Sequence, residues 1–446
     1  MKQRQLIGIL LAVWIIGFCC SPVFINWAVF PEEIRIMAGI PYALRLPLPL
    51  DLTLETDRDG LFVNDQELLP SQRLVGRGTC DLVSQQTGSL NIQMRLFGLV
   101  PIRRLNVEVL PPIEVVPSGH SIGVTISATT MVVGHATIKS ASGDAQPAKQ
   151  AGLRLGDLII GINDLAYPSV ATVAEEILRA GEDGHPIRFR VKRDGQELAI
   201  DVPPVLCQET GKYRVGLYVR DDAAGVGTLT FVDRESMTFG ALGHIVADVD
   251  TNHPLEVREG RVMLSRVTSI NQGKSGSPGE KRSIIVDNAA TVGTFTINTS
   301  IGIYGELLED ITTAQPLPVA LVDEVKPGKA EMWTVVEGEE VRPFEIDIVR
   351  VTRQSSPGGK GMVVRVSDPA LLEMTGGIVQ GMSGSPIVQN GRLVGAITHV
   401  FVNRPDSGYA VFAEWMVRES GLLEKRQQAA PTFFHRRDML RNAGGI

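Results

Sequence analysis

Residues 376–401 read Gly-Gly-Ile-Val-Gln-Gly-Met-Ser-Gly-Ser-Pro-Ile-Val-Gln-Asn-Gly-Arg-Leu-Val-Gly-Ala-Ile-Thr-His-Val-Phe. Two apolar segments of this stretch, Ile387-Val388 and residues 393–401, have the composition of β-strands. Asn390-Gly391 lies between them, and this dipeptide is a strong signal for a tight hairpin turn. The stretch therefore predicts a β-hairpin that follows a glycine-rich loop.

The loop from Gly381 to Pro386 carries the residue types that nucleophilic catalysis needs. A serine that attacks a carbonyl must lie on a tight, exposed turn, and backbone N–H groups must point at the developing oxyanion. Gly381 offers an N–H with no side chain in the way, and Ser383 offers its hydroxyl and its own N–H. The form Gly-x-Ser-Gly-x-Pro is that of the nucleophile loop of chymotrypsin-like serine peptidases. A glycine-rich β-turn that happens to contain serines is the alternative.

Two upstream residues are candidates to complete a catalytic set. His244 lies in the small, apolar segment 239–248 and is the candidate general base, although a lone histidine is more often structural. Asp368 precedes Pro369 at a predicted strand end, where it would hold the imidazole tautomer and stabilise the imidazolium. An aspartate in that position is also an ordinary turn former. The order His, Asp, Ser along the chain is that of chymotrypsin-like peptidases.

Other residues of these types receive different interpretations. Asp248 and Asp250 are metal ligands or surface charges, and we interpret them as surface charges. His399 is expected to line the substrate cleft. Residues 273–280 repeat Ser-Gly-Ser-Pro in a polar stretch with no strong apolar strand after it, which predicts an exposed loop. Because no zinc-type ligand cluster and no phosphate loop is present in the sequence, we expect no metal and no cofactor.

Residues 147–164 resemble the signature of PDZ domains, with a short helix that ends at Gly152, a turn and an apolar strand. A helix over 170–180 and strands over 187–193 and 197–202 are expected to complete the domain. The predicted carboxylate-binding loop, which would take a peptide C-terminus beside a strand edge, consists of Ser121, Ile122, Gly123 and Val124. A PDZ domain that only packs against its neighbour is the alternative.

The N-terminal residues have the composition of an export or membrane segment. Lys2 and Arg4 precede an uncharged run over residues 6–31, which is long enough to span a bilayer with its basic end in the cytoplasm. We favour an uncleaved anchor, and a cleaved signal peptide is the rival interpretation. The body would then lie outside the cytoplasm.

Length and charge limit the remaining possibilities. The 446 residues leave room for two or three domains. A net charge of -7 without a basic cluster argues against a nucleic-acid partner. The expected organisation is a membrane anchor or signal segment, a β-rich region, a PDZ domain, a serine peptidase domain and a C-terminal extension, over residues 1–31, 32–110, 111–204, 210–424 and 425–446.

Taken together, these motifs resemble those of the stage IV sporulation protein B peptidases of endospore-forming bacteria. The resemblance spans nearly the full chain and implies a mainly β fold: an N-terminal membrane helix, a PDZ domain of α/β sandwich-barrel type and a chymotrypsin-like double β-barrel. It also implies His244 as base, Asp368 as orienting acid and Ser383 as nucleophile. The C-terminal extension departs from the family pattern. The motifs that carry the resemblance occupy residues 213–221, 224–228, 239–244, 375–386 and 398–403.

The resemblance implies a regulatory protease. Such peptidases are exported into the space between the two forespore membranes, where they cleave themselves and cut a membrane-bound inhibitory partner. This cut releases an intramembrane protease that processes a pro-sigma factor. The PDZ domain is expected to hold the enzyme in check and to recognise the partner or the enzyme itself. Two rivals are an envelope-stress protease, in which PDZ domains follow the peptidase, and a PDZ scaffold that has lost activity.

Overall fold

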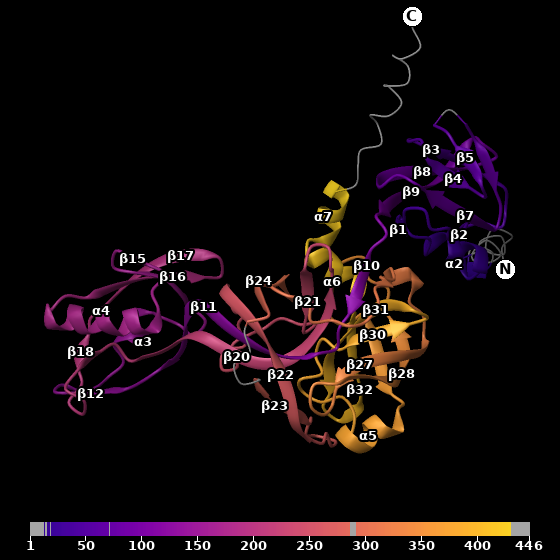
Figure 1. Cartoon of the computed structure of the whole chain (residues 1–446). Helices are drawn as coiled ribbons and strands as arrows, with labels where there is room; N and C mark the ends of the chain where they lie inside the picture. The colour runs from indigo at the N-terminus through magenta and orange to yellow at the C-terminus, as the bar shows by residue number, and fades with distance from the viewer. Residues whose placement is uncertain (1–12, 14–15, 18, 71, 286–290, 430–446) are drawn as a thin grey trace, which may run out of the picture. The chain divides into compact units, whose positions relative to one another are not determined.

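A computed structural model describes residues 13, 16–17, 19–70, 72–285 and 291–429 of the chain (Figure 1). The chain divides into two compact units. One comprises Met1–Ile113 together with Leu423–Ile446, and the other comprises Glu114–Leu422.

The first unit confirms that the region after the apolar leader is rich in β-structure. One sheet has the strand order β1-β9-β8-β3-β6 and the other β2-β7-β4-β5. Alternate apolar side chains of the strands, such as Leu52 and Leu54, are fully buried between them. The elements are α2 (Pro22–Ala28), β1 (Glu33–Met37), β2 (Tyr42–Arg45), β3 (Leu52–Thr56), β4 (Leu61–Val63), β5 (Gln66–Leu68), β6 (Leu74–Gly76), β7 (Thr79–Ser84), β8 (Gly88–Leu96), β9 (Val100–Leu110) and α7 (Leu422–Ala429).

The two ends of the chain lie largely outside the described residues. About half of the predicted anchor, residues 1–31, and most of the extension, residues 425–446, lie outside the described residues. Within the described part, the helices are all too short or too polar to cross a bilayer.

The second unit contains two β-barrels, which confirms the predicted double-barrel architecture. In the first, six strands form a closed ring in the order β11-β22-β24-β25-β21-β20, and β20 pairs back to β11. Flanking elements are β10 (Glu114–Pro117), β23 (Glu280–Ile285), β26 (Leu317–Pro318) and η1 (Val322–Glu324). The ring strands are β11 (Ser121–His135), β20 (Leu217–Val232), β21 (Thr238–Ala241), β22 (Val257–Asn271), β24 (Gly293–Thr299) and β25 (Gly302–Leu307).

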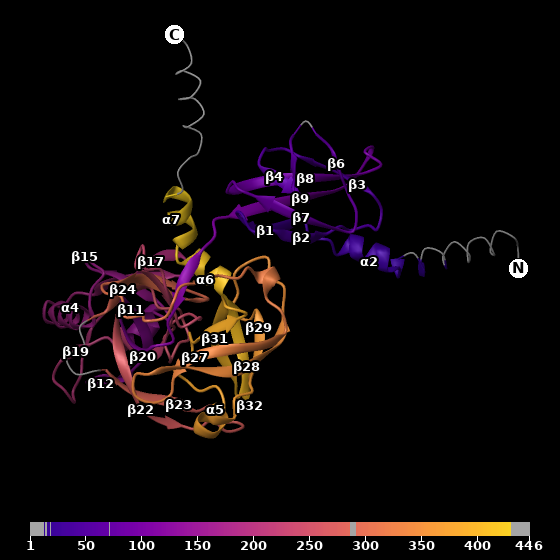
Figure 2. The same cartoon turned by 45° about the vertical axis from the view of Figure 1, so that its right-hand side comes forward.

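The second barrel contains the predicted hairpin. Strands β30 and β31 are joined at Asn390-Gly391, where both residues have positive φ angles (51° and 73°), as the sequence predicts. The barrel closes in the order β27-β28-β29-β32-β31-β30 (Figure 2). Its elements are β27 (Gly328–Val335), β28 (Val341–Val351), β29 (Met362–Val366), α5 (Pro369–Thr375), β30 (Pro386–Gln389), β31 (Arg392–Phe401), β32 (Arg404–Phe412) and α6 (Ala413–Glu419).

The PDZ domain lies between two strands of the first barrel, β11 and β20. The chain leaves the barrel along β11, forms the domain, and returns along β20. The predicted helix end at Gly152 is confirmed, because this residue caps α3 with a φ of 100°. The domain's elements are β12 (Ile138–Ser140), β13 (Gly143–Ala145), α3 (Pro147–Ala151), β14 (Leu158–Ile162), β15 (Leu165–Ala166), α4 (Val170–Glu182), β16 (Ile187–Arg193), β17 (Gln196–Val202), β18 (Val205–Leu206) and β19 (Tyr213–Arg214).

The expected domain boundaries stay a prediction, because strand β11 runs through both domains. Residues 122–127 of β11, which the sequence assigns to the PDZ domain, pair with both β20 and β22 of the first barrel. The far ends of β11 and β20 form a ribbon that continues into the PDZ domain, where Met131 also pairs with Leu158 of β14. Figure 1 shows this ribbon between the labels β11 and β20. The peptidase and PDZ parts therefore share two continuous strands.

Candidate active site

The nucleophile loop runs from the end of α5 to the start of β30. Gly381 and Gly384 both have a φ of 92°, which favours glycine. A β-carbon on Gly384 would lie 2.1 Å from the carbonyl oxygen of Thr228. The second glycine of the motif is therefore required because the loop lies directly against strand β20.

Strand β20 of the first barrel fixes the loop through three hydrogen bonds. The hydroxyl of Thr228 donates to the carbonyl of Gly381 at 2.8 Å, and its N–H donates to the carbonyl of Ser383 at 2.9 Å. The hydroxyl of Thr230 donates to the carbonyl of Gly384 at 2.7 Å. With the loop's carbonyls bound to β20, its N–H groups are left for other partners.

Two of these N–H groups belong to the residues predicted to form the oxyanion hole. Neither the N–H of Gly381 nor that of Ser383 has a hydrogen-bond partner among the described residues. The N–H groups of their neighbours are bonded: Met382 donates to Val379, and Gly384 donates to Ile397. Donors without a protein partner suit the stabilisation of an oxyanion.

His244 follows β21 after Leu242 and Gly243, which both have positive φ angles (68° and 69°). Its Nδ1 lies 2.8 Å from the carbonyl oxygen of Ile245. Because a carbonyl only accepts, Nδ1 carries the proton, and Nε2 keeps the lone pair that a general base needs. Burial lowers the pKa of His244, against the opposing effect of the Ile245 hydrogen bond, and this favours the neutral base.

Strand β31 brings His244 and Ser383 together. The hydroxyl of Ser383 donates to the carbonyl of Thr398 at 3.0 Å, and the ring of the next residue, His399, lies 5.4 Å from the ring of His244. A β-carbon on Gly243 would touch the Thr398 side chain at 3.1 Å. The candidate base and the candidate nucleophile therefore both contact Thr398 and His399 or their neighbours, and the serine hydroxyl is directed at a carbonyl.

Asp368 does not join this group in the structure. It is the N-cap of α5, and its Oδ1 accepts from the N–H groups of Ala370 and Leu371 at 2.9 and 3.1 Å. Its Oδ2 accepts from the N–H of Glu345 at 3.3 Å. The carboxylate keeps unused lone pairs, but no hydrogen bond or ion pair joins Asp368 to His244 in the described part of the chain. Its role as orienting acid stays a prediction.

Comparison with protein families places both parts of the second unit. Residues 211–417 match the model of the SpoIVB peptidase S55, and residues 121–203 match that of the PDZ domain. This chain belongs to the SpoIVB peptidase family. It is therefore a serine peptidase with a PDZ domain. No curated relative matches the chain.

Solved structures with some similarity are those of the Rv3671c protease from M. tuberculosis. The active form is 15% identical, covers 45% of this chain and 74% of its own, and has a TM-score of 0.28. An inactive alanine mutant is 12% identical, covers 46% and 83%, and has a TM-score of 0.26. Similarities of this size support no inference about the site of this SpoIVB peptidase.

A buried lysine, which sequence reasoning missed, lies beneath the nucleophile loop of this SpoIVB peptidase. Lys281 is 2% exposed. A β-carbon on Gly381 would lie 3.1 Å from the Lys281 side chain. Its Nζ donates to Oγ1 of Thr334 at 2.8 Å, and the hydroxyl of Ser385 donates to the same oxygen at 3.0 Å. A single lysine in a polar segment gives no sequence signal for such burial.

Residues 273–280 confirm the expected exposed loop: Ser275 and Ser277 are exposed between β22 and β23.

The interpretation of Asp248 as a surface charge is wrong, because its side chain is 1% exposed and bonded to Arg220. Arg220 lies on β20 and reaches the segment that follows His244.

The predicted carboxylate-binding loop is wrong as well. Ser121 to Val124 are buried in β11, with β20 on one side and β22 on the other, so no strand edge is left for a peptide. Val215-Gly216-Leu217 has a similar sequence, and there Gly216 turns the chain with a φ of 75° into β20. In the described residues, β11 is the only strand that pairs with β20 at 217–222. Both segments, 122–124 and 215–217, place an apolar residue on each side of a glycine, so the sequence offered the second segment as a candidate loop as well.

Helix α4 lies along this end of β20. Its first N–H, that of Val170, binds the Asp221 carboxylate at 2.9 Å, and a β-carbon on its Gly181 would overlap the Tyr213 side chain. A helix beside an unpaired strand edge is the arrangement that accepts an added peptide strand.

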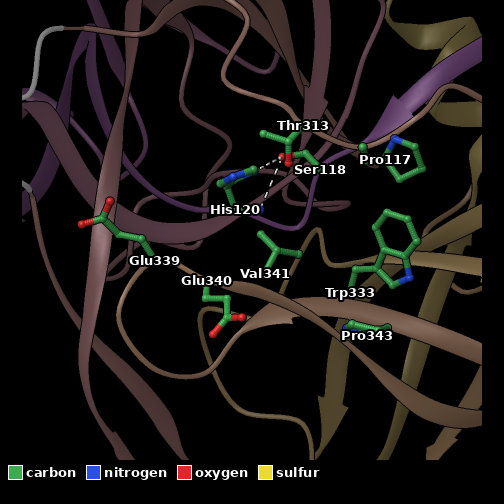
Figure 3. A pocket seen from close by; sticks show the side chains of 10 residues that line it. Pro117, Ser118, His120, Thr313, Trp333, Glu339, Glu340, Val341 and Pro343 are labelled. Atoms are coloured by element: carbon green, nitrogen blue, oxygen red, sulfur yellow. Dashed lines mark hydrogen bonds between the residues drawn. The ribbon is translucent and has the colours of Figure 1, made fainter.

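A pocket of about 390 Å³ lies in the second unit (Figure 3). Its walls include Pro117, His120, Trp333 and Pro343, and Glu339 and Glu340 line it as well. His244, Ser383 and His399 are not among its lining residues. The pocket is therefore distinct from the candidate active site.

Proposed function

We propose that this chain is a regulatory serine endopeptidase of sporulation, which cleaves itself and cuts a membrane-bound inhibitory partner between the forespore membranes. The observation that carries the peptidase part of the proposal is that β31 contacts both residues: the Ser383 hydroxyl bonds to Thr398, and the His244 ring lies 5.4 Å from the His399 ring. A membrane-tethered enzyme and a membrane-tethered substrate share a thin space, so weak binding suffices at a high effective concentration.

The proposed reaction is acyl transfer through Ser383. Nε2 of His244 takes the serine proton while Oγ attacks the peptide carbonyl, and the N–H groups of Gly381 and Ser383 receive the oxyanion. The imidazolium then gives its proton to the leaving amine. Water hydrolyses the acyl-enzyme by the same proton transfers in reverse. The Ile245 carbonyl holds the imidazole tautomer throughout.

The direction of the Ser383 hydroxyl supports a regulated enzyme. It donates to Thr398 in the structure, so the hydroxyl has to turn toward His244 before attack. This step gives the enzyme an inactive resting state. A signalling protease needs such a state, whereas a digestive enzyme does not.

We further propose that the PDZ partner is an extended segment with a free C-terminus, bound between α4 and the edge of β20. The N–H groups at Val215 to Leu217 would receive the carboxylate, and Leu217 and Val219 would border the first side-chain pocket, because both pack partly against the PDZ core. Fluorescence anisotropy of a labelled apolar peptide would test this. Leu217→Asp and amidation of the peptide should each weaken binding at least tenfold, whereas Tyr218→Ala, on the opposite face of β20, should not.

The decisive test of the peptidase is self-cleavage of the full chain compared with Ser383→Ala, followed by mass spectrometry of N-terminal fragments. The wild type should shorten, and the variant should stay intact until active enzyme is added. A serine-hydrolase probe should label Ser383 in the wild type and fail to label Ser383→Ala. Intact wild-type protein that the probe does not label would favour the inactive PDZ scaffold. Equal cutting of both proteins would exclude Ser383 as the nucleophile.

A further inference from the structure

Residues 245–256, which we call the base segment, follow His244 and determine where it lies. They contain neither a helix nor a named strand, so their position depends on contacts with other elements. Asn298 of β24 holds the start of the segment: its Oδ1 accepts from the N–H of Val246, and its Nδ2 donates to the Val246 carbonyl, both at 2.9 Å. The same Nδ2 also donates to the Leu255 carbonyl at 3.0 Å, near the end of the segment. The middle of the segment is contacted from the PDZ side.

Arg220 of β20 makes the central contact to the base segment. Its guanidinium donates through Nη1 to Oδ2 of Asp248 and through Nη2 to Oδ2 of Asp250 at 2.7 Å. The Asp248 side chain is 1% exposed, whereas that of Asp250 is 54% exposed. Removal of Arg220 therefore leaves a buried carboxylate without its cation, which is costly in a folded protein.

Asp248 also fixes the backbone of the base segment. Its Oδ1 accepts from the N–H groups of Asp250 and Thr251 at 3.1 and 2.9 Å. Burial by itself would raise the pKa of Asp248, but the hydrogen bonds from Thr251 and Arg220 outweigh burial and lower it. The ionised carboxylate thus joins β20 to the turn four residues after the base.

The PDZ domain makes further contacts to the same segment. The Lys192 ammonium of β16 pairs with Glu256 at 3.0 Å. The His253 ring lies 2.7 Å from where a β-carbon on Gly156 would be, so this PDZ turn packs directly on it. Arg220 itself pairs in register with Met131, the residue of β11 that joins β14. The ion pairs of Arg220 with Asp248 and Asp250 therefore lie where the shared ribbon enters the PDZ domain.

We propose that Arg220 is a positioning residue: through Asp248 it sets the place of His244 and makes that place depend on the PDZ end of β20. Farther along the same strand, Thr228 and Thr230 hold the nucleophile loop. Strand β20 thus holds the segments of both His244 and Ser383. A ligand bound at the PDZ end of β20 therefore changes how His244 is aligned with Ser383. The proposal rests on the peptidase function proposed above.

The test compares the kinetics of Arg220→Gln and Asp248→Asn in the full chain, with a peptide substrate identified from the self-cleavage site. We expect each variant to lower kcat on the order of 10- to 100-fold with little change in KM, because small misplacements of a catalytic group cost that much. The double variant should be no worse than the worse single variant. Arg220→Lys should be intermediate, and Asp250→Asn, which removes only the exposed partner, should lose less.

The control is Arg188→Gln, which breaks an exposed pair with Asp201 on the PDZ sheet and leaves the base segment untouched. Its kcat should equal that of the wild type. Thermal melting checks that each variant is folded at the assay temperature, and Asp248→Asn provides an isosteric variant if Arg220→Gln fails to fold. A folded Asp248→Asn or Arg220→Gln with wild-type kcat would overturn the proposal.

A measurement that needs no turnover separates this proposal from the peptidase function. The pKa of His244, followed by NMR of the imidazole, should move toward its ordinary value in Arg220→Gln, because a displaced ring is less buried. If the wild type neither cleaves nor reacts with the probe, the proposed function fails, and this shift still decides the role of Arg220. An unchanged His244 titration would refute it.

Discussion

Nζ of Lys281 lies 2.8 Å from Oγ1 of Thr334 in the interior of the second unit, and the hydroxyl of Ser385 donates to that same oxygen. Burial lowers the pKa of Lys281 to about 7, so the amine is partly neutral at physiological pH. A neutral amine still donates to Oγ1 of Thr334, which accepts from Ser385 with its second lone pair. The network can thus be satisfied without a buried charge beneath the nucleophile loop.

This burial predicts a pH dependence of stability. The folded pKa of Lys281 lies below the unfolded value of 10.5, so the unfolded state binds more protons between pH 7 and 10.5. The free energy of unfolding should gain about 1.4 kcal/mol per pH unit from this group across that range. Denaturant titrations of the wild type and Lys281→Met at several pH values measure the difference. Parallel pH curves for the two proteins would contradict a depressed pKa.

The pH dependence of activity should report His244. The base must be neutral, and burial lowers its pKa below the ordinary 6.5, so kcat/KM should rise with pH and reach half its plateau below pH 6.5. His399→Gln should leave this midpoint nearly in place, because burial and the Ile245 carbonyl are the principal influences on the His244 pKa. A midpoint above 6.5 would show that His244 is more exposed, or paired with an acid, in the working enzyme.

Asp368 can be tested by two substitutions that separate capping from catalysis. Asparagine caps a helix about as well as aspartate, whereas alanine costs roughly 1 kcal/mol. From its position at α5 we expect Asp368→Asn to keep both stability and kcat, and Asp368→Ala to lose stability. Thermal melting and peptide cleavage measure the two effects. A folded Asp368→Asn that has lost several orders of magnitude in kcat would identify the orienting acid, in an arrangement different from the resting one.

Two glycines with similar backbone angles should respond differently to alanine. Gly384 (φ 92°) lies against the Thr228 carbonyl, whereas Gly391 (φ 73°) has no atom within 4 Å of its would-be β-carbon. Gly391→Ala should cost only the backbone strain of about 1–2 kcal/mol. Gly384→Ala should cost more and abolish probe labelling of Ser383, since the loop has to leave β20. Equal melting temperatures for the two variants would refute this contact.

The sequence by itself determined much that is local. The Asn390-Gly391 hairpin, the helix end at Gly152, the PDZ signature and the nucleophile motif depend on residues close together in the chain, where turn chemistry and side-chain alternation suffice. The candidate base and nucleophile were found in the same way, and the structure brings their segments together.

The tertiary structure decided everything that depends on long-range pairing. Ile122-Gly123-Val124 and Val215-Gly216-Leu217 are similar as sequences, and only strand pairing buries the first at the centre of a barrel and leaves the second at an edge. Likewise, the sequence around Asp248 and Lys281 does not show that these charges are buried, because β20 and the nucleophile loop cover them only in the folded chain. Burial is a property of the neighbours that folding supplies, and those neighbours lie tens to hundreds of residues away in the chain.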